Sequence, residues 1–85
     1  MRDLQLPGRS PVITSNGMVS TSQPLSTSAA LTVLKDGGNA MDAALAACAV
    51  QAVVEPASTG IGGDCFCLYA PPDSPVIIAI NGSGR

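Results

Sequence analysis

The chain has 85 residues, a formal net charge of −2 and only four basic residues, which are scattered along its length. This distribution disfavours nucleic acids and anionic membranes as partners, because both bind through concentrated positive charge. A chain of this length that folds alone buries only about 60 to 65% of its unfolded surface, so its stability would be marginal.

The histidine and cysteine counts restrict the chemistry further. The absence of histidine removes Ser-His-Asp and Cys-His pairs, and the commonest metal ligand, from this chain. Three cysteines form no disulfide framework, and the methionine start lacks a signal-peptide pattern. We therefore expect free thiols, a cytoplasmic location, and no metal or other cofactor.

The first third of the chain predicts extended structure. Residues 1–11 are rich in proline and predict an irregular lead-in, while residues 12–21 are rich in β-branched side chains. Asn16-Gly17 is a strong turn dipeptide. We therefore predict two short strands flanking this turn.

Two helices follow. The first is predicted from Ser26 to Asp36, with a cap at Ser26, Thr27 or Ser28 and a glycine stop at Gly37 or Gly38.

The second helix starts at Asn39, whose side chain can accept from an unpaired amide, while Asp42 adds favourable charge in the first turn. Pro56 ends it. Its body is apolar nearly all round but too short for a bilayer span of about 18 to 20 residues, which predicts a core helix buried on several sides.

The last third predicts a hairpin. Residues 65–70 and 76–80 are two strands that are apolar on both faces, separated by a proline-rich turn. A hairpin with two apolar faces belongs inside a larger sheet with layers above and below it. The chain therefore has the features of the first part of a bigger protein.

Gly60-Ile61-Gly62-Gly63 raises the possibility of a phosphate-binding loop. The loop lacks the Lys-Ser/Thr of a Walker motif, and it joins a helix to a strand, whereas nucleotide fingerprints join a strand to a helix. A structural turn is the favoured interpretation.

A metal site at Cys65 and Cys67 is also disfavoured. Structural zinc needs four ligands and usually a wider cysteine spacing, and Cys48 lies on a different element. Buried small hydrophobic residues are the favoured interpretation, and a nucleophilic thiol would need a nearby base or positive charge.

Three charged residues are further candidates. Asp42 lies in the first turn of a helix, where negative charge is favourable, and this structural role already accounts for the residue. Glu55 lies at the end of a helix, where negative charge is unfavourable, which predicts that its carboxylate has a specific partner. Arg85 follows a strand in a Gly/Ser loop, where a guanidinium can bind a carboxylate, but on local evidence a solvated loop arginine is the favoured interpretation.

The order of motifs resembles the amino-terminal region of the gamma-glutamyltransferase family. The resemblance rests on Asn16-Gly17-Met18-Val19, Pro24-Leu25-Ser26, Gly37-Gly38-Asn39-Ala40-Met41-Asp42-Ala43-Ala44, Val54-Glu55-Pro56 and Gly60-Ile61-Gly62-Gly63, and covers most of the chain. Within the family, the chain looks most similar to the cytoplasmic amidohydrolase branch, which includes oxamate amidohydrolase.

This resemblance implies an α+β fold, the four-layer αββα sandwich of N-terminal-nucleophile hydrolases, of which residues 1–85 would be an incomplete amino-terminal part of the large chain without an internal boundary. It implies a precursor that cleaves itself and a downstream threonine that forms an acyl-enzyme with gamma-glutamyl or small amide substrates. No catalytic residue then lies in this chain. The implied partners are the small-molecule substrate, the remainder of the precursor and, in an oligomer, further copies.

The chain departs from the family pattern at Gln23 and Ala57, where histidine is frequent, and at Asp64, where glycine is usual. Aligning Ile80-Asn81 to the family's Asp-x-Arg-Glu pattern places Ser83 at the substrate-binding arginine, with Arg85 two residues further on. Ser83 and Arg85 are therefore the candidate substrate-binding residues. The alternative to an enzyme fragment is a noncatalytic module that docks on a partner or a full-length relative.

Overall fold

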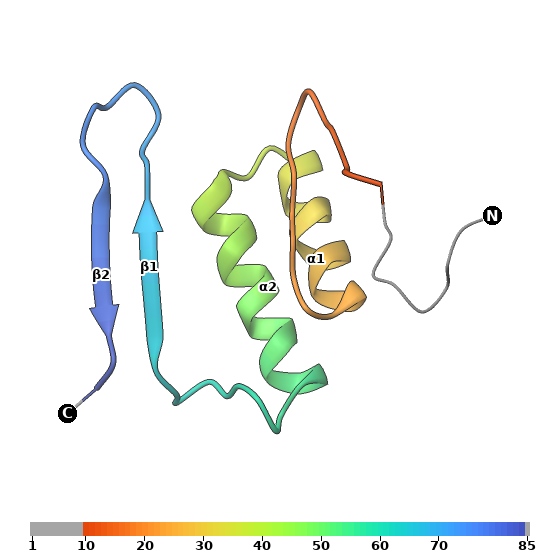
Figure 1. The fold of residues 1–85 in the computed structure, drawn as a ribbon, viewed down its shortest axis with the longest axis vertical. Helices are drawn as coiled ribbons and strands as arrows, with labels where there is room; N and C mark the ends of the chain where they lie inside the picture. Colours follow the sequence, from red (N-terminus) through yellow and green to blue (C-terminus); the bar gives the residue numbers. More distant parts are fainter. Residues whose placement is uncertain (1–9, 85) are drawn as a thin grey trace.

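The computed structural model describes residues 10–84, which form two helices followed by a two-stranded sheet (Figure 1). The predicted lead-in over residues 1–11 therefore falls largely outside the described residues. The two helices pack against each other, and the strands continue from them through the glycine-containing loop of residues 55–64.

Helix α1 spans Pro24–Lys35, two residues earlier than predicted at its start. Its N-cap is Gln23, whose side-chain oxygen accepts from the backbone N–H of Leu25, so the predicted serine or threonine cap is wrong. Proline suits the first helical position because it has no N–H to leave unpaired. With Gln23 as the cap, Ser26 is free to point into the helix pair, where it is fully buried.

Helix α2 spans Ala40–Val54 and begins as predicted. Asn39 Oδ1 accepts from the Asp42 N–H at 2.8 Å, and Asp42 Oδ2 accepts from the Asn39 N–H at 3.1 Å, which forms a reciprocal capping box. The expectation that α2 is buried on several sides is wrong for this chain, because Leu45 is 61% exposed and Val53 is 77% exposed.

Strands β1 (Cys65–Tyr69) and β2 (Ile78–Gly82) form the predicted antiparallel hairpin. The register pairs Cys65 with Gly82 and Tyr69 with Ile78, so β2 begins two residues later than predicted. The connection between the strands extends through residue 77, and Asp73 adopts a φ of 60° within it. Asx residues tolerate this left-handed conformation better than most.

The predicted strands over residues 12–21 do not form, although a bend occurs at the predicted turn. None of the backbone–backbone hydrogen bonds within residues 10–84 involves residues 12–22. A strand requires a partner strand to receive its backbone groups, and the described chain places none beside this segment.

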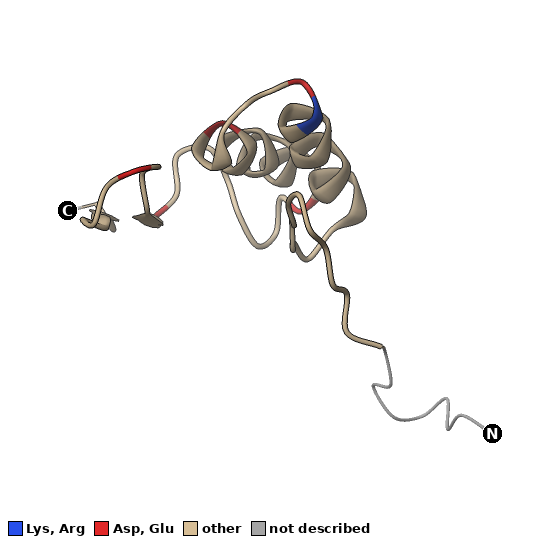
Figure 2. Cartoon of the chain, turned by 90° about the horizontal axis from the view of Figure 1, so that it is seen from above, with Lys and Arg blue, Asp and Glu red and all other residues tan. Residues whose placement is uncertain are grey.

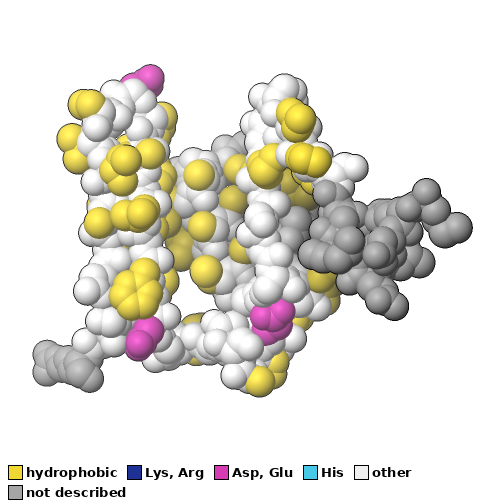
Figure 3. All heavy atoms as spheres, in the orientation of Figure 1, with side chains coloured by type: hydrophobic (Ala, Val, Ile, Leu, Met, Phe, Trp, Pro, Cys, Tyr) yellow, Lys and Arg dark blue, Asp and Glu magenta, His cyan; other side chains and the backbone are white. Residues whose placement is uncertain are grey.

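Few residues are buried. Among residues 10–84, only Ser26, Ala30 and Ala43 have less than a tenth of their surface exposed, and all three lie where α1 meets α2. The radius of gyration, 15.3 Å, exceeds the roughly 12 Å expected of a compact chain of this length. Figure 3 shows hydrophobic side chains spread over the hairpin surface. This architecture is that of an open, partial fold.

Charge is sparse on the described surface. Lys35 is the one basic residue within residues 10–84, and the acidic residues are dispersed over loops and helix ends (Figure 2). Neither helix in this range has both the length and the apolar character needed to cross a bilayer.

Candidate functional site

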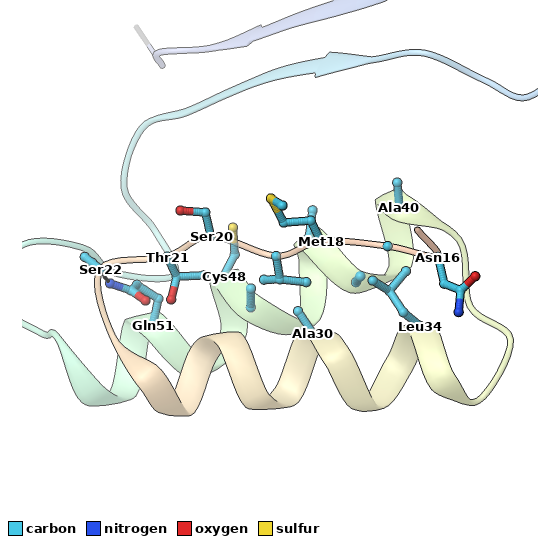
Figure 4. Close-up of a pocket in the computed structure, with 15 residues that line it drawn as sticks. Asn16, Met18, Ser20, Thr21, Ser22, Ala30, Leu34, Ala40, Cys48 and Gln51 are labelled. Carbon is cyan, nitrogen blue, oxygen red and sulfur yellow. Dashed lines mark hydrogen bonds between the residues drawn. The ribbon is translucent and has the colours of Figure 1, made fainter. Parts of the chain in front are cut away.

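An open groove of about 650 Å³ lies between residues 16–22 and the two helices (Figure 4). We call it the α1–α2 groove. Its helical wall consists mainly of small side chains, namely Ala30, Ala40, Ala43, Ala44, Ala47 and Cys48, with Leu34 at one end. Alanines leave space above the helices because they end at Cβ. The groove is therefore largely apolar.

One end of the groove is polar, and Gln51 of α2 is its centre. The Gln51 amide oxygen accepts from the buried Ser26 hydroxyl at 2.6 Å, and its amide nitrogen donates to Ser22 Oγ at 2.6 Å. The same nitrogen also donates to Glu55 Oε2. One side chain thus connects α1, α2 and the extended segment of residues 16–22.

Glu55 completes this polar network. Its Oε2 accepts from the Ser22 hydroxyl at 2.9 Å as well as from Gln51. These donors offset the unfavourable position of a carboxylate at a helix C-terminus. The prediction that Glu55 has a specific partner is confirmed, and the partners are Ser22 and Gln51.

A second set of hydroxyl contacts holds the extended segment against α1. Thr21 Oγ1 lies 2.6 Å from Thr27 Oγ1 and donates to the Gln23 carbonyl at 2.7 Å. Together with the Ser22 contacts, these bonds fix residues 21 and 22 at the start of α1. The groove wall is thereby anchored at its polar end.

Hydroxyls of Ser20, Thr21 and Ser22 line the groove, and the Ser22 hydroxyl donates to the Glu55 carboxylate at 2.9 Å. Among the described residues, neither a histidine nor a lysine lines the groove. The described residues also contain no group of three or more potential metal ligands.

The candidate substrate-binding residues lie elsewhere, at the end of the hairpin. Ser83 directly follows β2, is exposed, and its backbone N–H donates to Asn81 Oδ1 at 3.1 Å. Arg85 lies outside the described residues. Ser83 and the groove belong to different parts of the fold, and the described residues do not bring them together.

The three thiols are free, as expected. Cys67 is half-buried, but Cys48 and Cys65 are exposed, so the expectation that the cysteines are buried hydrophobic residues is wrong for these two. Their exposure has the same cause as that of Leu45 and Val53, because within residues 10–84 no further layer covers α2 or the hairpin.

The glycines of residues 60–63 form a turn, as predicted. The Gly63 N–H donates to the Gly60 carbonyl at 3.1 Å, and the loop leads from α2 into β1. The prediction that Asp42 is a helix-start residue is likewise confirmed by the capping box. Sequence reasoning did not identify the Ser22–Ser26–Gln51 network, because its members are separated by up to 29 residues.

Comparison with known proteins assigns the family. Residues 26–85 match the model of the gamma-glutamyltranspeptidase family. The chain is 42% identical over 72 residues to the oxamate amidohydrolase proenzyme of Klebsiella pneumoniae, and 43% identical over 74 residues to the glutathione hydrolase-like YwrD proenzyme of Bacillus subtilis. The matches cover 85% and 87% of this chain.

A solved structure supports the same relationship. The transpeptidase CapD of Bacillus anthracis superimposes with a TM-score of 0.68 at 37% identity, over 80% of this chain and 24% of that chain. The chain spans only 13% and 14% of the two curated relatives. On the basis of the motif set, the family match and the shared fold, the chain belongs to the gamma-glutamyltranspeptidase family.

Proposed function

We propose that the chain is the amino-terminal part of a gamma-glutamyltransferase-like amidohydrolase or acyltransferase that cleaves gamma-glutamyl or small amide bonds. The observation that carries this proposal is the family match over residues 26–85 together with 42% identity to an oxamate amidohydrolase proenzyme. The complete enzyme would be an αββα sandwich in the cytoplasm, and this chain would supply helices of one layer and strands of an adjacent sheet.

The proposed reaction uses a threonine from the downstream polypeptide. Its hydroxyl oxygen attacks the amide carbonyl, the amine leaves with a proton, and water or an amine then releases the acyl group from the threonine ester. Relatives carry the word proenzyme in their names, which supports a precursor that is cleaved. The 85-residue chain has no such nucleophile in its described part and should be inactive alone.

Expression of the complete gene tests this proposal. The complete polypeptide should split into two chains and hydrolyse oxamate or gamma-glutamyl-p-nitroanilide, whereas the 85-residue chain should hydrolyse neither. A matched variant, in which alanine replaces the threonine that cleavage would expose as the new amino terminus, should remain uncut and inactive. A complete polypeptide that is cut normally but cleaves no small amide would contradict the proposed reaction class.

For substrate binding, we propose Ser83 and Arg85. Ser83 follows β2 at the end of the hairpin, and the backbone continues through Gly84 with a φ of 78°. An arginine in such a loop offers a bidentate partner for a substrate carboxylate. A docking module without catalysis is less well supported, because the relatives have enzyme names.

Substitutions in the complete enzyme separate these roles. Arg85→Ala should lower kcat/KM by roughly 100-fold if it removes a charge-assisted contact of about 2 to 3 kcal/mol, and Ser83→Ala should lower it less. Asp73→Asn, in the connection at the opposite end of the hairpin, is the matched control. Unchanged kcat/KM in both Arg85→Ala and Ser83→Ala would reject this site.

A further inference from the structure

Asp64 lies at the same end of the hairpin as Ser83, one of the two proposed substrate-binding residues. Cys65 pairs with Gly82 at the last position of the ladder, so the next position along the two chain segments places Asp64 opposite Ser83. Residues that face each other across antiparallel strands have Cβ atoms about 4.5 to 5.5 Å apart. Both residues are exposed. The Asp64 carboxylate is therefore a neighbour of the proposed site.

The contacts of Gly84 and Ser83 define the position of this carboxylate further. A Cβ on Gly84 would lie 3.9 Å from Asp64 Oδ1, and the φ of 78° at Gly84 favours glycine. The Ser83 N–H donates to Asn81 Oδ1 at 3.1 Å, which holds the backbone at this point. Asp64 thus lies beside a backbone segment that carries one proposed binding residue and leads directly to the other.

No described cation on the hairpin balances the charge of Asp64. Lys35 is the one basic residue within residues 10–84, and it belongs to α1. Asp73 carries the same charge in the connection between the strands, and Figure 3 shows an acidic side chain at each end of the hairpin. A ligand bound at Ser83 would therefore experience the negative charge of Asp64.

A carboxylate beside a binding site selects ligands by charge and by hydrogen bonding. It accepts from an N–H group of the ligand, but it repels a second carboxylate. In oxamate, the carboxylate is bonded directly to the amide carbon, and hydrolysis with water gives oxalate and ammonium. The substrate thus has one negative charge and an N–H donor, whereas the product has two negative charges in nearly the same shape.

We propose that Asp64 is a specificity-determining residue of the site at Ser83 and Arg85. Its carboxylate favours a substrate with an N–H donor next to the substrate carboxylate, and it disfavours a ligand with a second carboxylate there, including the product of hydrolysis. This inference rests on the proposed function. Weak binding of a doubly charged product would limit its competition with the next substrate molecule.

Binding of oxalate to the complete, cleaved enzyme tests the inference. Asp64→Asn nearly keeps the size of the side chain and removes its charge, so it should bind oxalate about 5- to 10-fold more tightly than the wild type in isothermal titration calorimetry. A gain in affinity cannot result from a loss of folding. Asp64→Glu retains the charge and should bind oxalate as weakly as the wild type.

Asp73→Asn is the matched control, because it makes the same charge change at the opposite end of the hairpin and should leave the oxalate affinity unchanged. The gain in Asp64→Asn should also become smaller at an ionic strength of about 1 M than at about 0.1 M, because salt screens exposed charges.

Oxamate should respond in the opposite direction. Asp64→Ala removes the hydrogen-bond acceptor together with the charge, so the KM of oxamate should rise while oxalate binds more tightly. If oxamate is not hydrolysed, its dissociation constant from the same titration replaces KM. A general disturbance of the hairpin would instead weaken the binding of both ligands.

Several outcomes would overturn the inference. They are an oxalate affinity in Asp64→Asn equal to that of the wild type, an equal gain in Asp73→Asn, and no oxalate binding in any of these enzymes. Charge selection that depends on Asp64 in a polypeptide that cleaves no amide would reject the proposed function alone. An active enzyme whose oxalate affinity does not depend on Asp64 would reject only the role of Asp64.

Discussion

At the scale of single residues, the Gln51 side chain connects α1, α2 and the extended segment of residues 16–22. It accepts from the fully buried Ser26 hydroxyl and donates to Ser22 and Glu55. Gln51→Leu keeps a similar volume but leaves the buried hydroxyl without its acceptor, which should cost about 1 to 3 kcal/mol of unfolding free energy. Urea denaturation of the complete polypeptide, followed by circular dichroism, measures this loss.

The double variant Ser26→Ala/Gln51→Leu provides the control for Gln51. Replacing both partners by apolar groups removes the unsatisfied hydroxyl, so its cost should be smaller than the sum of the two single costs. Strictly additive costs would mean that the 2.6 Å contact between Ser26 and Gln51 does not contribute to stability.

Gly38 is required for a steric reason. A Cβ at this position would lie 2.5 Å from Val33 Cγ1 and 3.0 Å from the Val33 carbonyl oxygen. Gly38→Ala should therefore destabilise the protein by about 1 to 3 kcal/mol, as overpacking generally does. Gly60→Ala is the matched control, since nothing lies within 4 Å of its Cβ position.

Thermal unfolding of the Gly38 variants measures this effect. Val33→Ala combined with Gly38→Ala should recover part of the lost Tm, because it removes the nearer of the two clashing atoms. If Gly38→Ala and Gly60→Ala have the same Tm, the turn between α1 and α2 is not packed as described.

At the scale of elements, the start of α2 depends on its capping box. Asn39→Ala removes the acceptor for the Asp42 N–H and should cost about 1 kcal/mol, whereas Asn39→Ser should cost only a fraction of that. Chemical denaturation of both variants measures the difference. Equal costs for alanine and serine would contradict a role for the Asn39 side chain as the cap.

Local signals predicted those elements whose stabilising contacts lie nearby in the sequence. Asn39 and Asp42 are three residues apart, and the cap that they predict is present. The cap of α1 was placed wrongly at residues 26–28 because glutamine is a less common N-cap than serine or threonine. Ser26 instead bonds Gln51, 25 residues away, a contact that no local pattern reveals.

The extended segment and the groove also depend on contacts that local sequence patterns do not reveal. The β-branched residues of positions 12–21 favour strands, but pairing depends on a partner that local sequence does not supply. The groove is formed by residues 16–22 and helices that begin at residues 24 and 40, so its shape follows from packing rather than from any motif. The motif set nevertheless predicted the family correctly.

At the scale of the whole molecule, the distribution of apolar surface is the dominant feature. Phe66 is 69% exposed and Leu68 80% on one face of the hairpin, and Ile80, which pairs with Cys67 on the other face, is 52% exposed. Figure 3 shows hydrophobic side chains spread over the hairpin, and large exposed apolar surfaces bind other surfaces. The 85-residue chain expressed alone should therefore bind a hydrophobic dye and form large species in size-exclusion chromatography.

Substitutions on the hairpin test this expectation for the isolated chain. Leu68→Lys interrupts the apolar surface with a charge and should lower both dye fluorescence and the fraction of large species. Ile13→Lys is the matched control, because Ile13 is 90% exposed but lies far from the hairpin in sequence and outside the groove, so it should have little effect. In the complete polypeptide, the same Leu68→Lys change should reduce folding yield, because a covering layer would then have to bury a lysine. A monomeric 85-residue chain without dye binding would contradict this account and would favour an independent module over part of a larger sheet.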